Sequence, residues 1–153
     1  MRSYRLTDEV PANYYNFYEF LLIQPGPPLG TRQRSACVIV SNCSPGHRKA
    51  MIERLQKYIP VTFYGSCGTE PWPHDCGVNK NAKCSKLEVM QKHVIYLAFE
   101  NSQTPDYVTE KLYDGLSAGC VTVTYGAPNA IELAPKDSII SIASPEDGDT
   151  VGK

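Results

Sequence analysis

The sequence has no long apolar run and little net charge. Its most apolar N-terminal piece, residues 14–23, is interrupted by Asn16 and Glu19 and is shorter than the roughly 20 residues that a membrane-spanning helix needs. The formal net charge is −1, and 20% of the residues are charged. There is therefore no broad basic field that would attract nucleic acid or a membrane. We expect no nucleic acid partner, and no signal peptide or transmembrane segment is visible.

Metal-binding spacings are scarce. No CxxC or HxxxH pair occurs, so a zinc site built from His74 and nearby cysteines is only an alternative.

Six cysteines are too few for a disulfide scaffold but many for a cytosolic domain of 153 residues. Cys67, Cys76 and Cys84 crowd a loop rich in Gly, Pro and Asn, which indicates a disulfide-stapled loop in an oxidising compartment. Their pairing stays open.

Short apolar runs alternate with helical patterns along the chain. With 42% hydrophobic residues and a length of 153, the sequence predicts one folded domain with a substantial core. Alternating strands and helices predict an α/β fold with a parallel sheet. The expected strands are residues 36–41, 61–64, 94–99, 120–124 and 138–142, and the expected helices are residues 47–59, 87–93, 106–118 and 131–133. His93 is expected at the surface or at a strand edge.

The strand at residues 94–99 begins the most informative part of the chain. A polar stretch follows it and ends at Pro105-Asp106, where a helix with Asp106 as N-cap is expected. Gly119 suits the left-handed end of that helix. In open α/β sheets, ligands bind beyond the carboxyl ends of the strands. Asn101 and the first helical turn are therefore expected at a ligand-binding edge.

This predicted helix has two faces. Val108, Leu112 and Leu116 form an apolar side, because residues three and four apart share a face. A solvated charged face would explain the other side without any ligand. That second face comprises Tyr107, Glu110, Lys111 and Asp114.

Several ordered segments resemble one known family. The residues Phe99-Glu100-Asn101-Ser102, followed by residues 106–112 (DYVTEKL), are similar to the donor-binding signature of the α1,3-fucosyltransferases, glycosyltransferase family ten. Further family-like segments lie on both sides, with Thr122 where the family usually has Pro, and the resemblance covers about residues 3–142. These segments are residues 40–43 (VSNC), Arg48, residues 58–68 (YIPVTFYGSCG), residues 118–123 (AGCVTV) and residues 126–129 (GAPN).

The resemblance implies the C-terminal, donor-binding domain of a GT-B glycosyltransferase with a Rossmann-like parallel sheet and flanking helices. It implies an interdomain arm and linker at residues 1–30, a GDP-fucose-binding domain at residues 31–143, and a truncated polar tail at residues 144–153. In the family a glutamate of the N-terminal acceptor domain is the catalytic base. We expect that domain to be missing here, and we assign no base, since Glu9, Glu19 and Glu100 do not match it. Resemblance also implies a lumenal location at the Golgi cisterna membrane.

The implied reaction moves L-fucose from GDP-fucose to a glycan hydroxyl in α1,3 linkage, with inversion. By resemblance, Arg48 and Lys111 contact the diphosphate and stabilise the leaving group, and Tyr107 donates its hydroxyl to phosphate. Asn101 and Glu110 hold the ribose. These side chains suit those roles, because Arg can bind bidentately and a carboxylate matches paired hydroxyls. No divalent cation or other cofactor is implied.

The acceptor and the activity leave alternatives open. An N-glycan or another glycoprotein glycan is the implied acceptor, and the GAPN segment looks closest to the branch that acts on the innermost N-acetylglucosamine. One alternative is a catalytically incomplete sugar-nucleotide-binding module or gene fragment. Another is a secreted disulfide-rich binding domain, which would explain the cysteines but not residues 101–111. A solvated Arg48 is the alternative to phosphate binding.

Overall fold

The computed structural model describes residues 2–3, 10–11, 26–44, 46–73 and 84–144. A five-stranded sheet has the order β4-β3-β5-β6-β7, and all its neighbouring strands are parallel. A separate parallel pair joins β1 (Arg2–Ser3) and β2 (Val10–Pro11). The five strands are β3 (Gln33–Ile39), β4 (Val61–Tyr64), β5 (His93–Phe99), β6 (Val121–Tyr125) and β7 (Ile139–Ile142).

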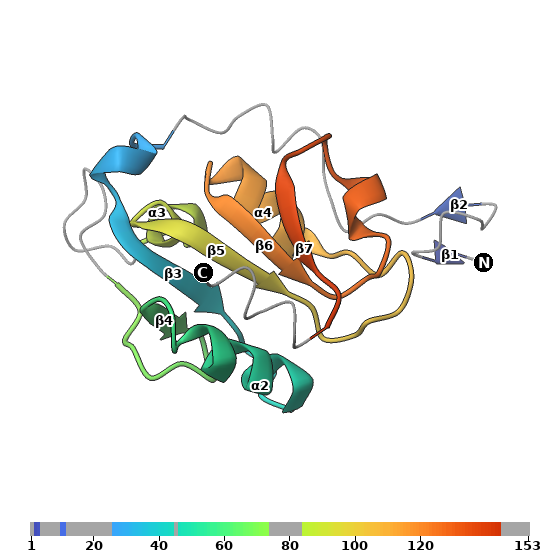
Figure 1. Ribbon diagram of the computed structural model, residues 1–153, viewed down its shortest axis with the longest axis horizontal. Helices are drawn as coiled ribbons and strands as arrows, with labels where there is room; N and C mark the ends of the chain where they lie inside the picture. Colours follow the sequence, from blue (N-terminus) through green and yellow to red (C-terminus); the bar gives the residue numbers. More distant parts are fainter. Residues whose placement is uncertain (1, 4–9, 12–25, 45, 74–83, 145–153) are drawn as a thin grey trace.

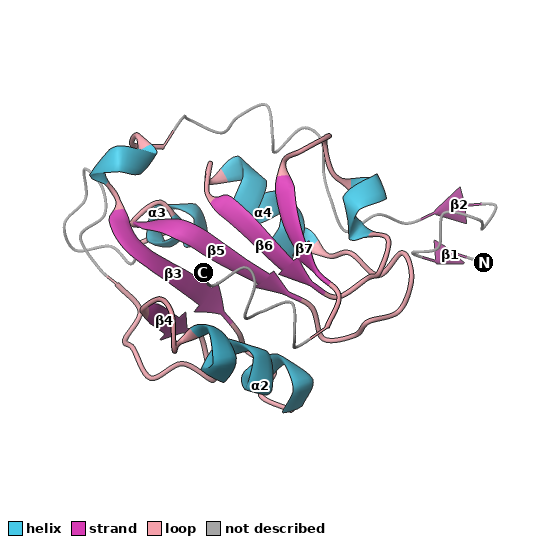
Figure 2. Ribbon diagram, in the orientation of Figure 1, coloured by secondary structure: helices cyan, strands magenta, loops and turns pink. Residues whose placement is uncertain are grey.

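Helices cover both faces of this sheet (Figures 1 and 2). Alternate residues of a strand point to opposite faces, so Val38 packs with α2 while its neighbour Cys37 packs with α3. This three-layer arrangement confirms the predicted α/β fold with a Rossmann-like parallel sheet. The helical segments are η1 (Leu29–Thr31), α2 (Gly46–Leu55), α3 (Lys86–Met90), α4 (Glu110–Ser117) and η2 (Ala130–Leu133).

The strand order changes direction between β3 and β5. After β3 the chain pairs β4 on one side, and it then crosses to place β5 on the other side, with Cys37 opposite Tyr96. The loops that leave β3 and β5 therefore diverge, which opens a crevice at the carboxyl edge of the sheet. Figure 1 shows α2 following β3 at this edge, while α4 lies on the opposite side of the sheet. The edge where a ligand was predicted to bind therefore contains a crevice.

The helix after β5 begins later than predicted. Asp106 has a φ of 64°, which is a left-handed conformation and does not start a right-handed helix. Thr109 is the N-cap instead, and its hydroxyl accepts a hydrogen bond from the backbone N–H of Lys111 at 3.5 Å. The predicted end is confirmed, since Gly119 has a φ of 63°. Similarly, α2 ends at Leu55 and not at Ile59.

The prediction for His93 was wrong. His93 begins β5, the middle strand, and is 1% exposed. The Ser35 hydroxyl lies 2.7 Å from its Nδ1, and the Tyr64 hydroxyl lies 3.2 Å from its Nε2. Burial lowers the pKa of the His93 imidazole, and the charge of Lys92 lowers it further. His93 is therefore a neutral core residue whose two ring nitrogens both have partners.

A disulfide joins Cys43 to Cys67. It connects the loop after β3 to the loop after β4, at the same edge as the crevice. Cys84 is also disulfide-bonded, whereas Cys37 and Cys120 are free and buried. A disulfide at Cys67 is thus confirmed, but its partner lies upstream and not within the crowded loop. Cys76 and His74 lie outside the described residues.

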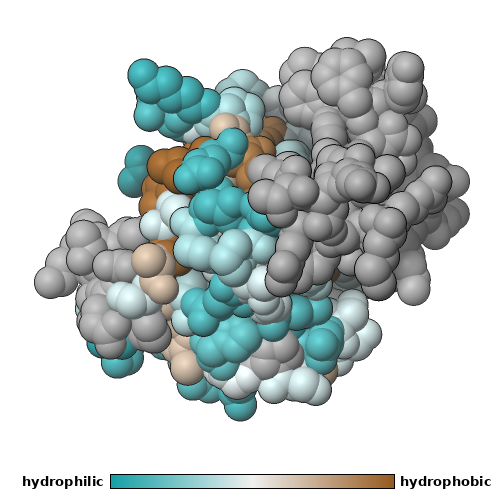
Figure 3. Space-filling model, turned by 90° about the vertical axis from the view of Figure 1, so that its right-hand side faces the viewer, coloured by the Kyte–Doolittle hydropathy of each residue, from teal (hydrophilic) through white to brown (hydrophobic). Residues whose placement is uncertain are grey.

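The described surface is mainly hydrophilic on the side drawn in Figure 3, with a small apolar patch. Four large apolar side chains are exposed among the described residues: Leu29, Tyr58, Ile131 and Ile140. Within those same residues, no helix combines the length and the hydrophobicity needed to cross a bilayer.

Candidate functional site

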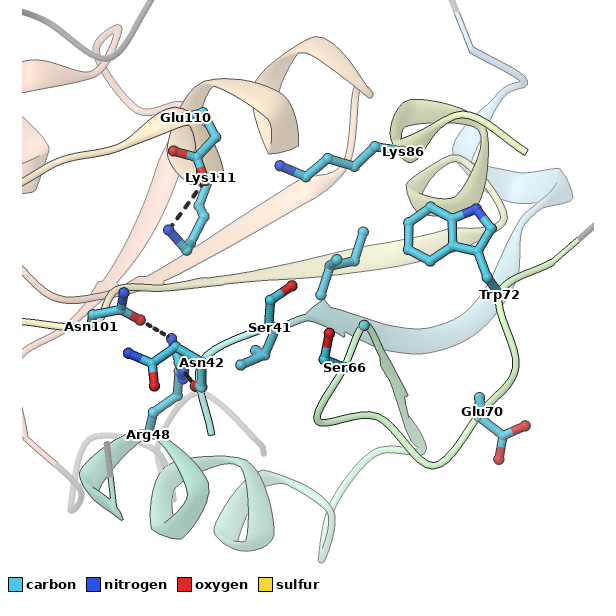
Figure 4. A pocket seen from close by; sticks show the side chains of 13 residues that line it. Ser41, Asn42, Arg48, Ser66, Glu70, Trp72, Lys86, Asn101, Glu110 and Lys111 are labelled. Carbon is cyan, nitrogen blue, oxygen red and sulfur yellow. Dashed lines mark hydrogen bonds and ion pairs between the residues drawn. The ribbon is translucent and has the colours of Figure 1, made fainter. Parts of the chain in front are cut away.

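A cavity of about 820 Å³ opens at the carboxyl edge of the sheet. It lies where the loops after β3, β4 and β5 meet the start of α4 (Figure 4). Two of its three cationic side chains reach it from opposite sides, Arg48 from α2 and Lys111 from α4. The remaining polar residues of its lining are Ser41, Asn42, Ser66, Glu70, Lys86, Asn101 and Glu110.

Arg48 is a buried cation with fixed geometry. It is 3% exposed, and its Nη1 donates to Asn101 Oδ1 at 2.5 Å and to the carbonyl of Phe99 at 3.4 Å. Its Nη2 donates to the carbonyl of Asn42. Burial lowers the pKa of Arg48 and nearby Glu100 opposes that shift, but guanidinium stays protonated at neutral pH. Among the described residues it forms no ion pair, so its charge is available to an anion.

Lys111 is held on the other side of the cavity. Its Nζ lies 3.1 Å from Glu100 Oε2 and 3.3 Å from Glu110 Oε1, and its side chain is 15% exposed. It also donates to the Thr109 hydroxyl at 2.8 Å. Lys111 is thus a partly exposed ammonium anchored to a buried carboxylate. Arg48 and Lys111, both predicted to bind phosphate, share one cavity.

Asn101 and Glu110 also line this cavity, as the predicted pair of ribose ligands would require. Partial burial alone would raise the pKa of the Glu110 carboxyl, but Lys111 and the other interactions leave that pKa below its usual value. Glu110 is therefore an anion at neutral pH, with its side chain 47% exposed. Tyr107, the fifth predicted ligand, is half-buried and is not among the lining residues.

The end of the cavity away from Arg48 and Asn101 is lined by Trp72 and Lys86. Trp72 lies there (Figure 4), and its indole N–H donates to the carbonyl of Cys84 at 2.7 Å. Its ring packs edge-on against Tyr64, with the centroids 6.2 Å apart. Lys86 points toward the α4 side and pairs with Asp114. This end therefore combines a fixed aromatic ring with polar groups.

A sequence profile of one family matches most of the chain. The profile is described as glycosyltransferase family 10 (fucosyltransferase), C-terminal part, and it matches residues 29–149.

The chain belongs to glycosyltransferase family 10.

Its relatives within curated proteins are fucosyltransferases by name. The family 10 chain is 35% identical to a fucosyltransferase-like protein of Arabidopsis thaliana over 151 residues. The aligned region covers 97% of this chain and 28% of that protein. It is 31% identical to alpha-(1,3)-fucosyltransferase 7 of Rattus norvegicus, over 92% of this chain and 36% of the relative. It is 32% identical to GDP-fucose protein O-fucosyltransferase 3 of Xenopus tropicalis, over 78% of this chain and 26% of the relative. The chain thus spans about a third of these relatives' length.

The fold has a counterpart among solved structures. A crystal structure of an alpha1,3-fucosyltransferase with GDP-fucose matches with a TM-score of 0.66 and 23% identity, over 82% of this chain and 36% of the other. The likeness supports the Rossmann-like parallel α/β fold predicted for this family 10 chain.

Some site residues carry no sequence signal that points to the cavity. Trp72 lies after β4 and Lys86 is the first residue of α3, and their approach to the cavity depends on tertiary structure. Glu100 is different. It directly follows the β5 strand, so the rule that placed Asn101 at the ligand edge applies to it as well.

Proposed function

We propose that this chain supplies the donor site of a fucosyltransferase that moves L-fucose from GDP-fucose to a glycan hydroxyl, with inversion. The observation that carries the proposal is the approach of Arg48 and Lys111 to one cavity at the carboxyl edge of the sheet. A nucleotide diphosphate has the complementary charge, and the two cations differ in a useful way. Arg48 is a buried planar guanidinium, whereas Lys111 is a compact ammonium held at the cavity by a buried carboxylate. In this proposal, residues 31–143 are the donor-binding domain.

The reaction needs stabilisation of a departing anion. As the bond between the fucose anomeric carbon and the diphosphate oxygen breaks, the electron pair passes to that oxygen and the sugar becomes oxocarbenium-like. Fixed cations at this oxygen lower the barrier, because they act where charge develops. Arg48 and Lys111 take that role in the proposal. The acceptor hydroxyl then attacks from the opposite face and loses its proton to a base, for which we assign no residue in this chain.

Asn101 and Glu110 are the proposed ribose ligands. Asn101 Oδ1 accepts from Arg48, so its amide N–H groups are the donors it can offer a ligand. Glu110 is an anionic acceptor beside the same cavity, and a carboxylate can accept from two adjacent hydroxyls. Tyr107 remains a proposed phosphate donor, and reaching the cavity would require its side chain to move.

Acceptor and compartment are proposed more broadly. The names of the relatives include both α1,3-fucosylation and protein O-fucosylation, and we propose a glycoprotein acceptor, with an N-glycan favoured. The disulfide between Cys43 and Cys67 supports an oxidising compartment of the secretory route, such as the Golgi lumen. Transfer assays on a panel of N-glycans, N-acetyllactosamine and folded peptide domains, made with a full-length version, would identify the acceptor.

Calorimetry tests the donor site directly. The chain is titrated with GDP-fucose, GDP, GTP and UDP, beside Lys111→Ala and a control, Lys136→Ala, that removes an exposed lysine outside the cavity. We expect selective binding of the guanosine diphosphates that is lost in Lys111→Ala and kept in the control. A folded wild-type chain without nucleotide affinity would contradict the proposal. Donor binding without transfer in the full-length version would instead favour a sugar-nucleotide-binding module.

A further inference from the structure

Glu100 is a buried carboxylate beside the cavity but outside its lining. It is 4% exposed and directly follows β5. It is absent from the lining residues, although its neighbour Asn101 is one of them. A buried carboxylate is costly unless hydrogen bonds and opposite charge compensate it. The groups that compensate the Glu100 carboxylate therefore indicate its function.

Those partners all belong to the beginning of α4. Glu100 Oε1 accepts from the backbone N–H of Thr109 at 2.8 Å. The Thr109 hydroxyl lies 2.8 Å from Oε1 and 2.9 Å from Oε2. Glu100 Oε2 also accepts from Lys111 Nζ at 3.1 Å. The carboxylate thus ties the N-cap residue and the ammonium to the end of β5.

Gly126 leaves the room that the Glu100 side chain occupies. A Cβ at position 126 would lie 2.7 Å from the Glu100 Cβ and 2.8 Å from its Cγ, which is too close for carbon atoms. The backbone N–H of Glu100 donates to the carbonyl of Tyr125 at 2.9 Å. The side chain is therefore confined between the loop after β6 and the start of α4.

The three donors of the Lys111 ammonium are all in use. An ammonium has three N–H donors and no acceptor, and here they face Glu100 Oε2, the Thr109 hydroxyl and Glu110 Oε1. The bond to Glu110 is the longest of the three at 3.3 Å and has the most exposed partner. An anion that enters the cavity would therefore displace Glu110 first. The bonds to Glu100 and Thr109 would stay.

We propose that Glu100 is a positioning residue, which fixes two donors of Lys111 so that the third is exchanged from Glu110 to a diphosphate oxygen. The exchange releases the Glu110 carboxylate toward the hydroxyls of the same ligand. One binding event thus supplies both an oriented cation and a free acceptor. This inference rests on the proposed donor site, and it adds a residue that touches no ligand.

A double-mutant cycle on GDP affinity tests this role. Calorimetry with GDP compares wild type, Glu100→Gln, Lys111→Met and the double variant, and Glu132→Gln serves as a control at an exposed acid of η2. Gln keeps the shape of Glu but loses the charge that holds the ammonium. We expect Glu100→Gln to weaken GDP binding about tenfold, as for a lost charge-assisted contact. In the Lys111→Met background, Glu100→Gln should change the GDP affinity by less than about twofold, because Glu100 acts on GDP binding through Lys111.

The outcomes separate the two proposals. A wild-type chain that does not bind GDP would refute the donor site and this inference with it. If wild type binds but the losses of the two variants simply add, Glu100 has a structural role alone and the inference falls. Guanosine, which has no phosphate, should bind wild type and Glu100→Gln equally. Should Glu100→Gln fail to fold, Glu100→Asp withdraws the carboxylate by one methylene, and wild-type GDP affinity in that variant would refute the inference.

Discussion

Asp106 and Asn129 hold each other through two reciprocal hydrogen bonds across two loops. The backbone N–H of Asp106 donates to Asn129 Oδ1 at 2.9 Å, and Asn129 Nδ2 donates to Asp106 Oδ1 at 2.7 Å. The pair connects the loop between β5 and α4 to the loop after β6. Asp106 has a left-handed backbone conformation and stands immediately before Tyr107.

Replacing Asn129 by Ala should destabilise the fold. The substitution leaves the Asp106 N–H and carboxylate without this partner, and we expect a loss of about 1–3 kcal/mol in the free energy of unfolding. Urea denaturation of Asn129→Ala measures it, with Gln103→Ala as a control at an exposed position of the same loop. Equal stability of the two variants would mean that the Asp106–Asn129 pair does not hold the loop.

Arg48→Lys should weaken GDP binding by about tenfold or more, because a single ammonium does not reproduce the forked contacts of a guanidinium. It should also lower thermal stability, since the carbonyls of Asn42 and Phe99 lose a donor. Calorimetry and thermal unfolding measure the two effects, beside Arg34→Lys at an exposed position of β3. Wild-type affinity in Arg48→Lys would exclude a role for the forked geometry.

The Cys43–Cys67 disulfide should contribute measurably to stability. It closes a loop with a sequence separation of 24 residues, for which the chain-entropy estimate is about 3.5 kcal/mol. The double variant Cys43→Ser/Cys67→Ser isolates this bond, whereas a reductant would also attack the disulfide of Cys84. A loss below about 1 kcal/mol in urea denaturation would show that native packing already restricts these loops.

His93 should make stability fall in mild acid. Its pKa is lowered in the folded chain from the usual 6.5, so the unfolded chain binds more protons between the two pKa values. The free energy of unfolding should therefore decrease as the pH falls below about 6.5 and level off below the folded pKa. Urea denaturation at several pH values across this range measures the free energy of unfolding. This free energy should change less with pH in His93→Asn than in wild type. An identical change with pH in the two would exclude His93 as the cause.

GDP binding is expected to need no divalent cation, because Arg48 and Lys111 supply the positive charge. In the described part of the chain, no three His, Cys, Asp or Glu side chains are grouped to hold a metal ion. Carboxylates are ligands for Mg²⁺, and the sequence contains one Asp-x-Asp pair, Asp147 and Asp149, which lies outside the described residues. Calorimetry with EDTA and with Mg²⁺ should give the same affinity. Loss of binding in EDTA, or in Asp147→Asn/Asp149→Asn, would contradict this.

Much of the fold could be predicted because its strands are short and apolar. All five strands of the main sheet were expected within a few residues, and Gly119 marked the end of α4 through its left-handed backbone. The start of α4 was missed because two side chains decide it. Asn129 holds Asp106 outside the helix, and Thr109 caps it instead. Pairing across 23 residues leaves no local pattern.

The site was predicted unevenly for a similar reason. Arg48, Asn101, Glu110 and Lys111 come together as the family resemblance implied. Contacts between distant segments escaped prediction, because such contacts depend on how loops pack. His93 was misassigned because its two hydroxyl partners come from other strands.

The near balance of charge around the cavity has a kinetic consequence. The cavity is lined by three cations, Arg48, Lys86 and Lys111, and by the carboxylates of Glu70 and Glu110. Behind the lining, Glu100 pairs with Lys111 and Asp114 pairs with Lys86, so the net charge around the cavity is close to zero. Long-range steering of a polyanion then contributes little to capture. The association rate should therefore depend only weakly on ionic strength, and abundant competing phosphates should gain little from their charge alone. Selectivity would come from exchange of hydrogen bonds at close range.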